Sequence, residues 1–458
     1  MSAPRSSLRP TRDELREMLR LATPLVLVNV GLMLMGVVDT LMLGRVSGEA
    51  LAAGGLGHFC FWFVGTVGFG LIMAIDPVVA QAVGAKDDVG LARGVQRGVV
   101  IAVLVTAGAS LLLIPSGPAL ELLRQPPRIA PLAGWFAIWS IPGLLPFFLF
   151  GVFRSTWQAM HAVRPILVGV VVGNVANAFL NWVFIFGHLG APAGGVVGSA
   201  ISTSIARWIM LGAALLAGWP ALRPTLRPWR PESFAIEPLG RMLAIGVPLG
   251  LQFFAEFNAF GLVTIFMGWL GAEALAAHEV TLNLASLTFQ VPLGAAAATG
   301  VMVGRAIGRE DMHAARRDAV AGLVIGVGFM VVAGLVMIAI PGVLSRLYTT
   351  DPATLAIATA LIPVAGLFQV FDGTQAVATG TLRGAGDTRV PMLIHLTGFW
   401  VVGIPMSAWL CFGLGLGATG LWWGFVAGLG SVSVLHIWRV RAKLGRDVRR
   451  LVIDYPPA

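Results

Sequence analysis

Acidic residues inside long apolar stretches are the first sign of chemistry in this 458-residue chain. They are Asp39, Asp76, Glu256 and Asp372, with Glu279 near the end of such a stretch. A charge at the centre of a membrane-spanning helix costs roughly 2.5–3.5 kcal/mol on insertion scales. Each carboxylate must therefore face a polar cavity, pair with a cation or carry a proton, and all three describe a site that handles ions.

Glu256 and Asp372 are the expected partners in one such site. Glu256 lies two turns beyond Pro248, and Asp372 lies midway along a different apolar stretch. Two carboxylates in a low-dielectric pocket cannot both ionise cheaply. We therefore expect one of them to hold a proton, or a cation to lie between them.

Asp39 and a pair of asparagines are the other candidates for ion binding. Asn177 and Asn181 are four residues apart, so they share one face of a helix. Two carboxamides aligned with a carboxylate would make an oxygen-rich site suited to a proton or a hard monovalent cation. Two alternatives stay open: Asp39 could reach the membrane interface, and asparagines often join helices inside membranes. We prefer that structural role for Asn174.

Other polar residues in these stretches have simpler interpretations. Asp76 precedes a proline, so it is expected to cap the backbone at a kink, and His278-Glu279 are expected to begin a span and cap it at the interface. We find no Ser-His-Asp set, HExxH pair, P-loop or zinc-ligand spacing, and Cys60 and Cys411 lie far apart in apolar runs. We predict no enzyme activity, no cofactor and no metal.

The composition places the chain in a membrane. It is 57% hydrophobic and 12% charged, whereas about 25% of the residues of a soluble domain are charged. The formal charge of +9 does not indicate nucleic-acid binding, because that would need a basic face on a soluble domain. We expect a polytopic membrane protein that contacts lipid and has no nucleic-acid partner.

Twelve apolar stretches are long enough to cross about 30 Å of hydrocarbon. The expected spans are residues 21–44, 56–83, 95–116, 133–153, 166–187, 195–218, 243–268, 280–304, 318–341, 357–381, 391–413 and 418–438. The polar segment before the first span lacks the features of a cleavable signal peptide, and Thr11-Arg-Asp-Glu14 resembles a capping box. A short surface helix is therefore expected to lead into the first span.

The distribution of arginine and lysine predicts the orientation in the membrane. Of the 31 basic residues, 26 fall on the side that holds both termini, and only Arg207 lies within a span. The remaining four are Arg45, Arg124, Arg128 and Arg346. Because cytoplasmic loops carry the excess of basic residues, both termini are predicted to be cytoplasmic.

The two halves of the sequence repeat at an offset of 224 residues, which becomes about 226 in the later elements. Ala-Thr-Pro24-Leu answers Gly-Val-Pro248-Leu, and Gly-Glu-Ala-Leu51 answers Ala-Glu-Ala-Leu275. The expected parts are an N-terminal segment (1–20), a lobe of six spans (21–218), a proline-rich cytoplasmic linker (219–241), a second lobe of six spans (242–438) and a cytoplasmic tail (439–458). Because six is even, the lobes are parallel, which leaves a cavity between them that can open alternately to either side.

The repeat does not extend to the acids. Its offset maps Glu256 onto Leu32 and Asp39 onto Val263, so each lobe is expected to have its own polar site. Methionine and phenylalanine side chains near these acids would accept flat, lipophilic cations with little demand on shape. The predicted lining of the substrate cavity is Met33, Met35, Phe253, Phe257, Phe289, Gln290 and Phe368.

Several motifs together resemble the multidrug and toxic compound extrusion (MATE) transporters, with the NorM-like bacterial branch favoured. They include Gly-Glu-Ala-Leu-Ala-Ala at 48–53, Ala-Gln-Ala-Val-Gly-Ala at 80–85, Asn-Ala-Phe-Leu-Asn-Trp at 177–182 and Thr-Leu-Arg-Gly-Ala-Gly-Asp-Thr at 381–388. The likeness covers essentially the whole chain. It implies an all-α polytopic membrane protein with twelve transmembrane helices in two parallel six-helix lobes.

The resemblance also implies roles for single residues of the first lobe. Asp39 matches an acid that takes a proton or a sodium ion, Asn177 and Asn181 match its partners, and Thr203 matches a hydroxyl ligand. Some relatives have an aspartate at the position of Asn181, so a site with two carboxylates is not available in this lobe.

In the second lobe, Glu256 and Asp372 match the cation pair of NorM-like members. Phe368 stands one turn before Asp372, where some relatives have a tyrosine hydroxyl. This departure weakens a sodium site in the second lobe and favours proton coupling.

The implied function is secondary active efflux of organic cations and lipophilic drugs in exchange for H+ or Na+ by alternating access. The protein would act as a monomer in a bacterial inner membrane. A flippase of lipid-linked precursors from the same superfamily is the alternative, but it would need arginines in its cavity and commonly fourteen spans. A scaffold protein without transport would need no oriented acids in its spans.

Overall fold

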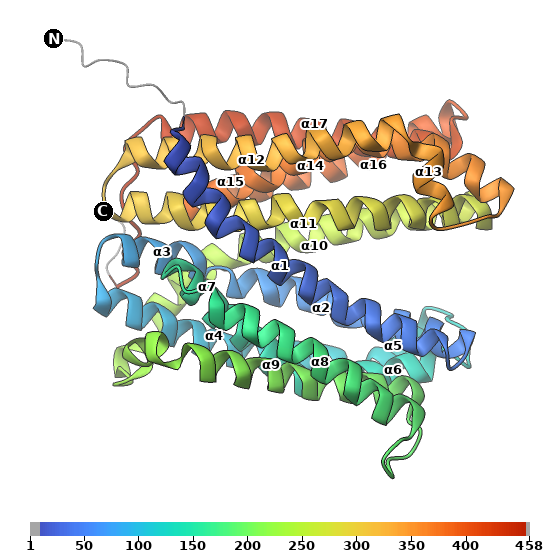
Figure 1. Ribbon diagram of the computed structural model, residues 1–458, viewed down its shortest axis with the longest axis horizontal. Helices are drawn as coiled ribbons and strands as arrows, with labels where there is room; N and C mark the ends of the chain where they lie inside the picture. Colours follow the sequence, from blue (N-terminus) through green and yellow to red (C-terminus); the bar gives the residue numbers. More distant parts are fainter. Residues whose placement is uncertain (1–9, 455–458) are drawn as a thin grey trace. The chain divides into compact units, whose positions relative to one another are not determined.

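The structure, a computed structural model, describes residues 10–454 and contains helices but no strand in that range. Twelve of the helical stretches described are long and apolar enough to cross a membrane (Figure 1). Large apolar side chains such as Leu216 and Val332 are 85% and 61% exposed. Broad surfaces of this kind are rare on water-soluble monomers and are expected where lipid replaces water. The predicted all-helical membrane fold with twelve spans is confirmed.

The helices form two compact units. The N-unit comprises Leu27–Gly250 and the tail from Val452, and the C-unit comprises Leu251–Leu451 and the chain up to Val26. Helices wholly within the N-unit are α2 (Gly48–Ile72), α3 (Ile75–Gly84), α4 (Asp88–Leu113), α5 (Ser116–Leu122), α6 (Ala130–Ser140), α7 (Leu144–Ala159), α8 (Arg164–Phe186) and α9 (Gly195–Leu226). Those within the C-unit are α11 (Ala272–Gly308), α12 (Met312–Ala339), α13 (Pro341–Arg346), α14 (Pro352–Gly384), α15 (Arg389–Leu396), α16 (Ile404–Ala408) and α17 (Gly417–Leu444).

Two long helices are shared between the units. They are α1 (Arg12–Gly44) and α10 (Ile236–Leu270), and each passes from one unit to the other two residues beyond its internal proline. The prolines are Pro24 and Pro248, which the repeat pairs with each other. An internal proline removes a backbone hydrogen bond and favours a bend. The division between the units therefore falls inside helices, rather than in the segment 219–241.

The repeat is visible in the helix boundaries. The segment formed by α2 and α3 starts at Gly48 and ends at Gly84, and the offset of the repeat maps these ends onto the start and the end of α11. The same offset maps the start of α4 at Asp88 onto the start of α12 at Met312. The sequence repeat therefore predicts the helix boundaries of the second copy from those of the first.

The copies differ clearly in the eleventh span. Its counterpart, α8, is one regular helix, whereas this span alternates α15 and α16 with π-helical turns at Thr397–Gly403 and Trp409–Gly413. Turns of this type insert an extra residue and are frequent at functional sites. His395 lies two residues before the first of these turns.

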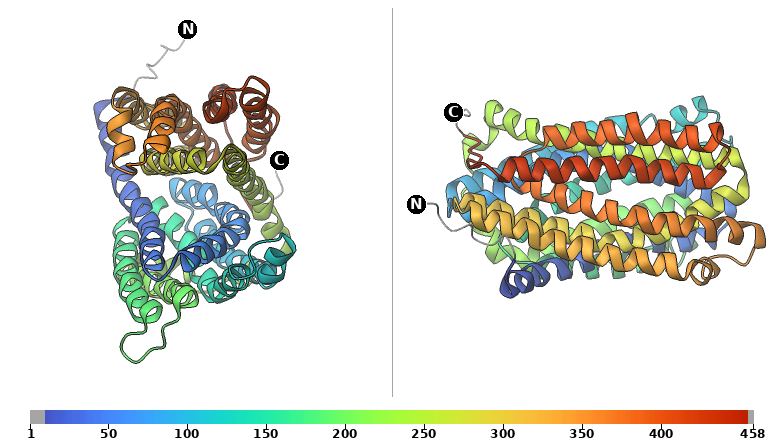
Figure 2. Two further views of the ribbon diagram at one scale, coloured as in Figure 1. Left: turned by 90° about the vertical axis from the view of Figure 1, so that its right-hand side faces the viewer. Right: turned by 90° about the horizontal axis from the view of Figure 1, so that it is seen from above.

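Small residues let α11 and α14 of the C-unit pack closely, side by side (Figure 2). A side chain at Gly380 would meet the backbone of Ala296, and one at Gly384 would meet the backbone of Gly300. Small residues at regular spacing are the usual means of close helix contact in membranes. This contact holds α14, and with it Asp372, in a fixed position against α11.

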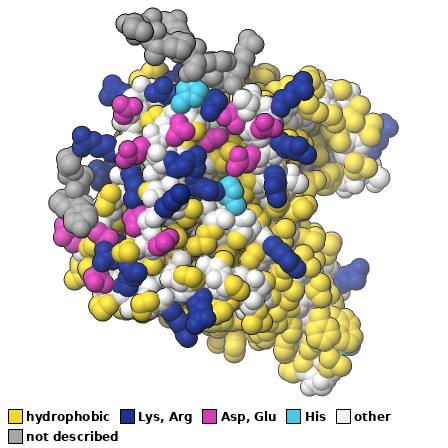
Figure 3. All heavy atoms as spheres, turned by 60° about the vertical axis from the view of Figure 1, so that its left-hand side comes forward, with side chains coloured by type: hydrophobic (Ala, Val, Ile, Leu, Met, Phe, Trp, Pro, Cys, Tyr) yellow, Lys and Arg dark blue, Asp and Glu magenta, His cyan; other side chains and the backbone are white. Residues whose placement is uncertain are grey.

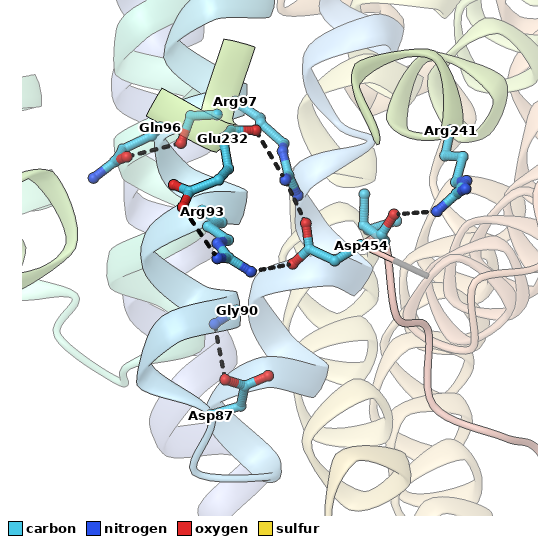
Figure 4. Close-up of polar contacts among 10 residues, drawn as sticks. Asp87, Gly90, Arg93, Gln96, Arg97, Glu232, Arg241 and Asp454 are labelled. Carbon is cyan, nitrogen blue, oxygen red and sulfur yellow. Dashed lines mark hydrogen bonds and ion pairs between the residues drawn. The ribbon is translucent and has the colours of Figure 1, made fainter. Parts of the chain in front are cut away.

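Charged side chains gather at the end of the helices that Figure 3 brings forward, while hydrophobic side chains cover the flanks beside it. In the N-unit, Arg93 and Arg97 of α4 both pair with Asp454 in the tail (Figure 4). Arg97 also donates to the backbone carbonyl of Glu232 at 3.2 Å, and Arg241 of α10 donates to the backbone of the tail at 2.8 Å. These contacts fasten the tail from Val452 to the N-unit.

Two expectations about the ends of helices need comment. The capping box is confirmed, because Thr11 N donates to Glu14 Oε2 at 2.7 Å and Glu14 N donates to Thr11 Oγ1 at 3.2 Å. The helix that it begins is not a separate surface helix, since α1 continues without interruption into the first span. The proline-rich segment is also more helical than expected: α9 continues through two prolines to Leu226, which leaves residues 227–235 before α10.

Candidate ion-coupling sites

Three helices build the acidic site of the N-unit. Asp39 lies on α1 near its end, Asn177 and Asn181 lie one turn apart on α8, and Thr203 lies on α9. Gly187 ends α8 in a left-handed conformation with a φ of 79°, so the chain can turn back and pack α9 along α8. The predicted asparagine pair thus faces the predicted hydroxyl.

Three donors converge on the Asp39 carboxylate. Asn181 Nδ2 and Asn177 Nδ2 donate to Oδ1 at 2.6 Å and 3.0 Å, and Thr203 Oγ1 donates to Oδ2 at 2.8 Å. The four side chains are at most 8% exposed. Hydrogen bonds to an ionised acceptor are the stronger kind, and this arrangement satisfies an ionised carboxylate. A carboxylate has about four lone-pair sites, so one position on Oδ2 stays open for a proton or a cation.

The asparagines also hold one another in place. Asn181 Nδ2 donates to Asn177 Oδ1 at 3.3 Å, and Asn177 Nδ2 donates to Thr203 Oγ1 at 3.1 Å. The Oδ1 atom of Asn181 is buried and has no hydrogen-bond partner among the described residues. A buried acceptor without a partner is costly, so this oxygen is a candidate ligand for a bound cation.

Asn174 has the structural role that we expected. Its Nδ2 donates to the carbonyl oxygen of Gly31 at 2.9 Å and to that of Val170 at 2.8 Å. These bonds join α8 to α1 and leave the Asp39 carboxylate to the other two asparagines.

Arg207 of α9 is the charged neighbour of the Asp39 cluster. It is 8% exposed and interacts electrostatically with Asp39. Its guanidinium lies 4.2 Å from the ring centroid of Phe61 and 5.2 Å from that of Phe147. Stacking on aromatic faces offsets part of the cost of burying the cation. The sequence shows Arg207 within a span, but no pattern in it points to these partners.

The acidic site of the C-unit is built differently. Glu256 of α10 and Asp372 of α14 interact electrostatically, as expected for partners. The Asp372 residue is 7% exposed and the Glu256 side chain is 20% exposed. Neither carboxylate accepts a hydrogen bond from a residue in the described part of the chain. Their charge must therefore be balanced in another way than that of Asp39.

A histidine contacts this acidic site, and the sequence analysis missed it. His395 of α15 is fully buried, and its Nε2 lies 3.8 Å from Glu256 Oε2. The same nitrogen lies 2.6 Å from Gln375 Nε2 and 3.3 Å from Gln252 Nε2. His436 of α17 is also fully buried, with its ring centroid 4.9 Å from that of His395. The available signal was the position of His395 inside the expected span 391–413.

Phe368 belongs to the aromatic core of the C-unit. It is 2% exposed, and its ring centroid lies 5.6 Å from that of Trp422, 6.1 Å from that of Phe425 and 6.2 Å from that of Phe260. The position one turn before Asp372 thus contributes packing and no oxygen atom.

The residues predicted to line a substrate cavity divide between the two units. Met33 and Met35 are in the N-unit, whereas Phe253, Phe257, Phe289, Gln290 and Phe368 are in the C-unit. Met35 is buried, and Gln290 donates to its own helix at Ser286 O. Their role in binding substrate stays a prediction.

Two further polar positions test the simpler interpretations. Asp76 lies in the first turn of α3, just after the helix break that follows α2, and accepts a hydrogen bond from Ser155 of α7. His278 does not cap a span, which was the expectation, because α11 begins six residues earlier at Ala272. It is fully buried and contacts Thr264 Oγ1 at 3.2 Å and Trp422 Nε1 at 3.2 Å.

Known proteins share this architecture. The MatE family model matches residues 24–183 and 248–409, one stretch in each copy of the repeat. A Burkholderia vietnamiensis protein named "Multidrug resistance protein NorM" is 38% identical over 438 residues, which cover 93% of each chain.

Solved structures with the same fold include the eukaryotic MATE transporter AtDTX14, with a TM-score of 0.85 and 23% identity over 94% of this chain and 98% of that one. The Vibrio cholerae MATE transporter VcmN, in its bent form, has a TM-score of 0.84 and 18% identity over 94% of this chain and 97% of that one. Matches in both halves, and the identity to a NorM protein over nearly the full length, show that this chain belongs to the MatE family and is a NorM-like transporter rather than an enzyme.

Proposed function

We propose that this protein is a multidrug efflux antiporter, which exchanges outward movement of organic cations and lipophilic drugs for inward movement of H+ or Na+. The observation that carries the proposal is an acidic site within the helices of each unit, formed by buried Asp39 in one and by partly buried Glu256 with buried Asp372 in the other. Carboxylates at membrane depth are costly and mark ion and proton pathways. The name of the Burkholderia relative supports drugs as the exported substrates.

Competition between ion and drug supplies the coupling. A proton or sodium ion on a carboxylate removes the negative charge that attracts a cationic drug, so binding of one disfavours binding of the other. The absence of a hydroxyl at Phe368 favours the proton over sodium in the C-unit. In this proposal Asp39, Asn177, Asn181 and Thr203 form the N-unit coupling site, and Glu256 and Asp372 form that of the C-unit.

We place the protein in a bacterial inner membrane, as a monomer with both termini in the cytoplasm. The excess of basic residues on the side of the termini supports this orientation. The flippase alternative is not favoured, because Arg207 stacks on two aromatic rings and interacts electrostatically with Asp39 instead of being free to bind an anionic head group.

Transport in proteoliposomes tests the proposal. Purified protein is reconstituted, and export of an ethidium-like dye is followed after a pH step and, separately, after a sodium step. Asp39→Asn and Glu256→Gln should each abolish export against a gradient, whereas Glu273→Gln, at an exposed acid at the start of α11, should not. Export at wild-type rates by both carboxylate variants would overturn the proposal. The coupling ion is identified by which step, in pH or in sodium, drives export by the wild type.

A further inference from the structure

The C-unit contains a pair of buried histidines that the proposed exchange does not yet use. His395 and His436 are both fully buried, and their rings lie 4.9 Å apart between centroids. They come from α15 and α17, whereas Glu256 comes from α10. Histidine is the side chain whose ordinary titration range matches physiological pH. One histidine beside a coupling carboxylate, with a second histidine behind it, therefore calls for a functional explanation.

The contacts of His395 define its hydrogen positions. Nδ1 lies 3.2 Å from the carbonyl oxygen of Pro391, which can only accept, so Nδ1 carries the hydrogen. In the neutral ring, Nε2 is then an acceptor. The Nε2 amides of Gln375 and Gln252 can donate to it, at 2.6 Å and 3.3 Å. Nε2 is also the atom that lies 3.8 Å from Glu256 Oε2.

The two glutamines can serve the protonated ring equally well. Gln375 Oε1 and Gln252 Oε1 are both buried without a hydrogen-bond partner among the described residues. Rotation of either amide by half a turn would replace its NH2 group by this oxygen, which accepts a hydrogen bond from a protonated Nε2. The Glu256 carboxylate would balance the new positive charge. The site can therefore hold His395 with or without the extra proton.

His436 has the free capacity that a second proton carrier needs. Neither of its ring nitrogens makes a hydrogen bond of acceptable geometry to a described residue, although the Pro391 carbonyl also interacts with the ring. Leaving a buried polar group unpaired costs roughly 1–3 kcal/mol. His436 therefore has an open position for a proton or for a transient partner.

The histidines lie closer to one end of the unit than the carboxylates do. At a rise of about 1.5 Å per residue, Asp372 is about 18 Å from the end of α14 at Gly384, whereas His395 is about 9 Å from the start of α15. His436 is about 12 Å from the end of α17 on the same basis. This is the end that the basic residues assign to the cytoplasm, and Arg439 pairs there with Asp387 at 2.6 Å.

We propose that His395 and His436 form a proton-release path from Glu256 to the cytoplasmic end of the C-unit; this inference rests on the proposed antiport. The proton leaves the Glu256 carboxylic acid, which becomes a carboxylate, and binds Nε2 of His395. The resulting imidazolium returns to neutral by passing one proton to His436, which releases it toward the helix ends. The charged or titratable groups next to this path are Glu256 on α10, which lies beside His395 and acts on Asp372 of α14, and His436 on α17, which acts on His395.

Two transport modes separate this path from a packing role. Export of dye driven by a pH step requires net proton release, whereas exchange of dye for dye at equal pH requires only drug binding and alternation. Reconstituted His395→Gln and His436→Gln should lose at least about tenfold in pH-driven export, because a missing proton carrier commonly costs more than that. Their dye exchange should stay within about twofold of the wild type, as should both activities of the control His313→Gln, at a partly exposed histidine on α12.

Two results would overturn the inference. Export driven by a pH step at the wild-type rate in both histidine variants would show that protons leave by another route. Loss of dye exchange together with export in both variants would show a structural role. Failure of the proposed antiport is recognised separately, because Asp39→Asn and Glu256→Gln would then export dye normally. If Asp39→Asn and Glu256→Gln lose dye export while both histidine variants export dye normally, only the release path is wrong.

Discussion

The acidic sites of the N-unit and the C-unit stand on copies of one repeat but balance their charge in opposite ways. In the N-unit, the Asp39 carboxylate accepts three hydrogen bonds from α8 and α9. In the C-unit, no described residue donates to Glu256 or Asp372, and the ring of His395 contacts Glu256. The repeated helices thus provide equivalent positions, while the side chains decide how an ion is held.

This difference indicates different tasks. Neutral donors from α8 and α9 hold the Asp39 carboxylate of α1, so a change in its charge alters the hydrogen bonds that join these three helices. Glu256 contacts a side chain that can itself take a proton, so it can exchange protons without moving a helix. We infer that the N-unit site senses the ion and the C-unit site transfers it.

Among substitutions that keep both Asp39 and Glu256, removal of the second carboxylate of the C-unit should have the largest effect. Asp372→Asn removes the carboxylate on which the charge of Glu256 acts, so the site loses one of its two ionisable groups. Coupling free energies of 1–3 kcal/mol correspond to factors of about 5–150, and we expect a loss toward the upper end in pH-driven export. The rate of pH-driven dye export in proteoliposomes measures this loss. An unchanged export rate would show that Glu256 acts alone.

Asn181→Leu should have the next largest effect, in the N-unit. It removes the shortest hydrogen bond to Asp39 and the buried, unpaired Oδ1 atom. A hydrogen bond to a charged group contributes about 1.5–3 kcal/mol, so export should fall by about tenfold or more. Equal export by this variant and the wild type would assign the asparagine pair to helix packing.

Thr203→Val should cause a smaller loss. The valine has nearly the same shape but cannot donate to Asp39 Oδ2, while both asparagine donors remain. A loss of about 1 kcal/mol corresponds to about fivefold slower export. Thr203→Ser should restore export; if it does not, the methyl group and not the hydroxyl is what matters.

Asn174→Ala should affect stability and leave transport nearly unchanged. Asn174 bonds only to backbone carbonyl oxygens of Gly31 and Val170, away from the carboxylate. Hydrogen bonds between membrane helices contribute about 0.6–2 kcal/mol, so the melting temperature of the purified protein should fall by a few degrees. A strong loss of export at full stability would extend the Asp39 site to this asparagine.

The fold and the acids could be predicted from the sequence because membrane spans and repeats leave regular patterns. Lipid excludes charge, so Asp39, Glu256 and Asp372 stood out, and the offset of the repeat showed that neither Leu32 nor Val263 repeats an acid. The same offset relates the helix boundaries of the two copies.

Features that depend on three-dimensional contact were not predictable in this way. In the sequence, His395 is a single histidine in an apolar run. Only the fold brings Glu256 of α10, Gln375 of α14 and His436 of α17 next to it. The passage of α1 and α10 from one unit into the other also leaves no sequence pattern, because the apolar character of these helices continues through Pro24 and Pro248. The start of α11 at Ala272, ahead of the expected span 280–304, was not predictable either. It places His278 inside the helix instead of at its end.

Dye binding at equilibrium as a function of pH tests the central claim, that each unit has its own ion site, most directly. Protons compete with a cationic dye, so the affinity of wild-type protein should rise as pH rises. Asp39→Asn and Glu256→Gln should each weaken this dependence, and only the double variant should abolish it. An unchanged pH dependence in either single variant, or its complete loss in one of them, would contradict the account.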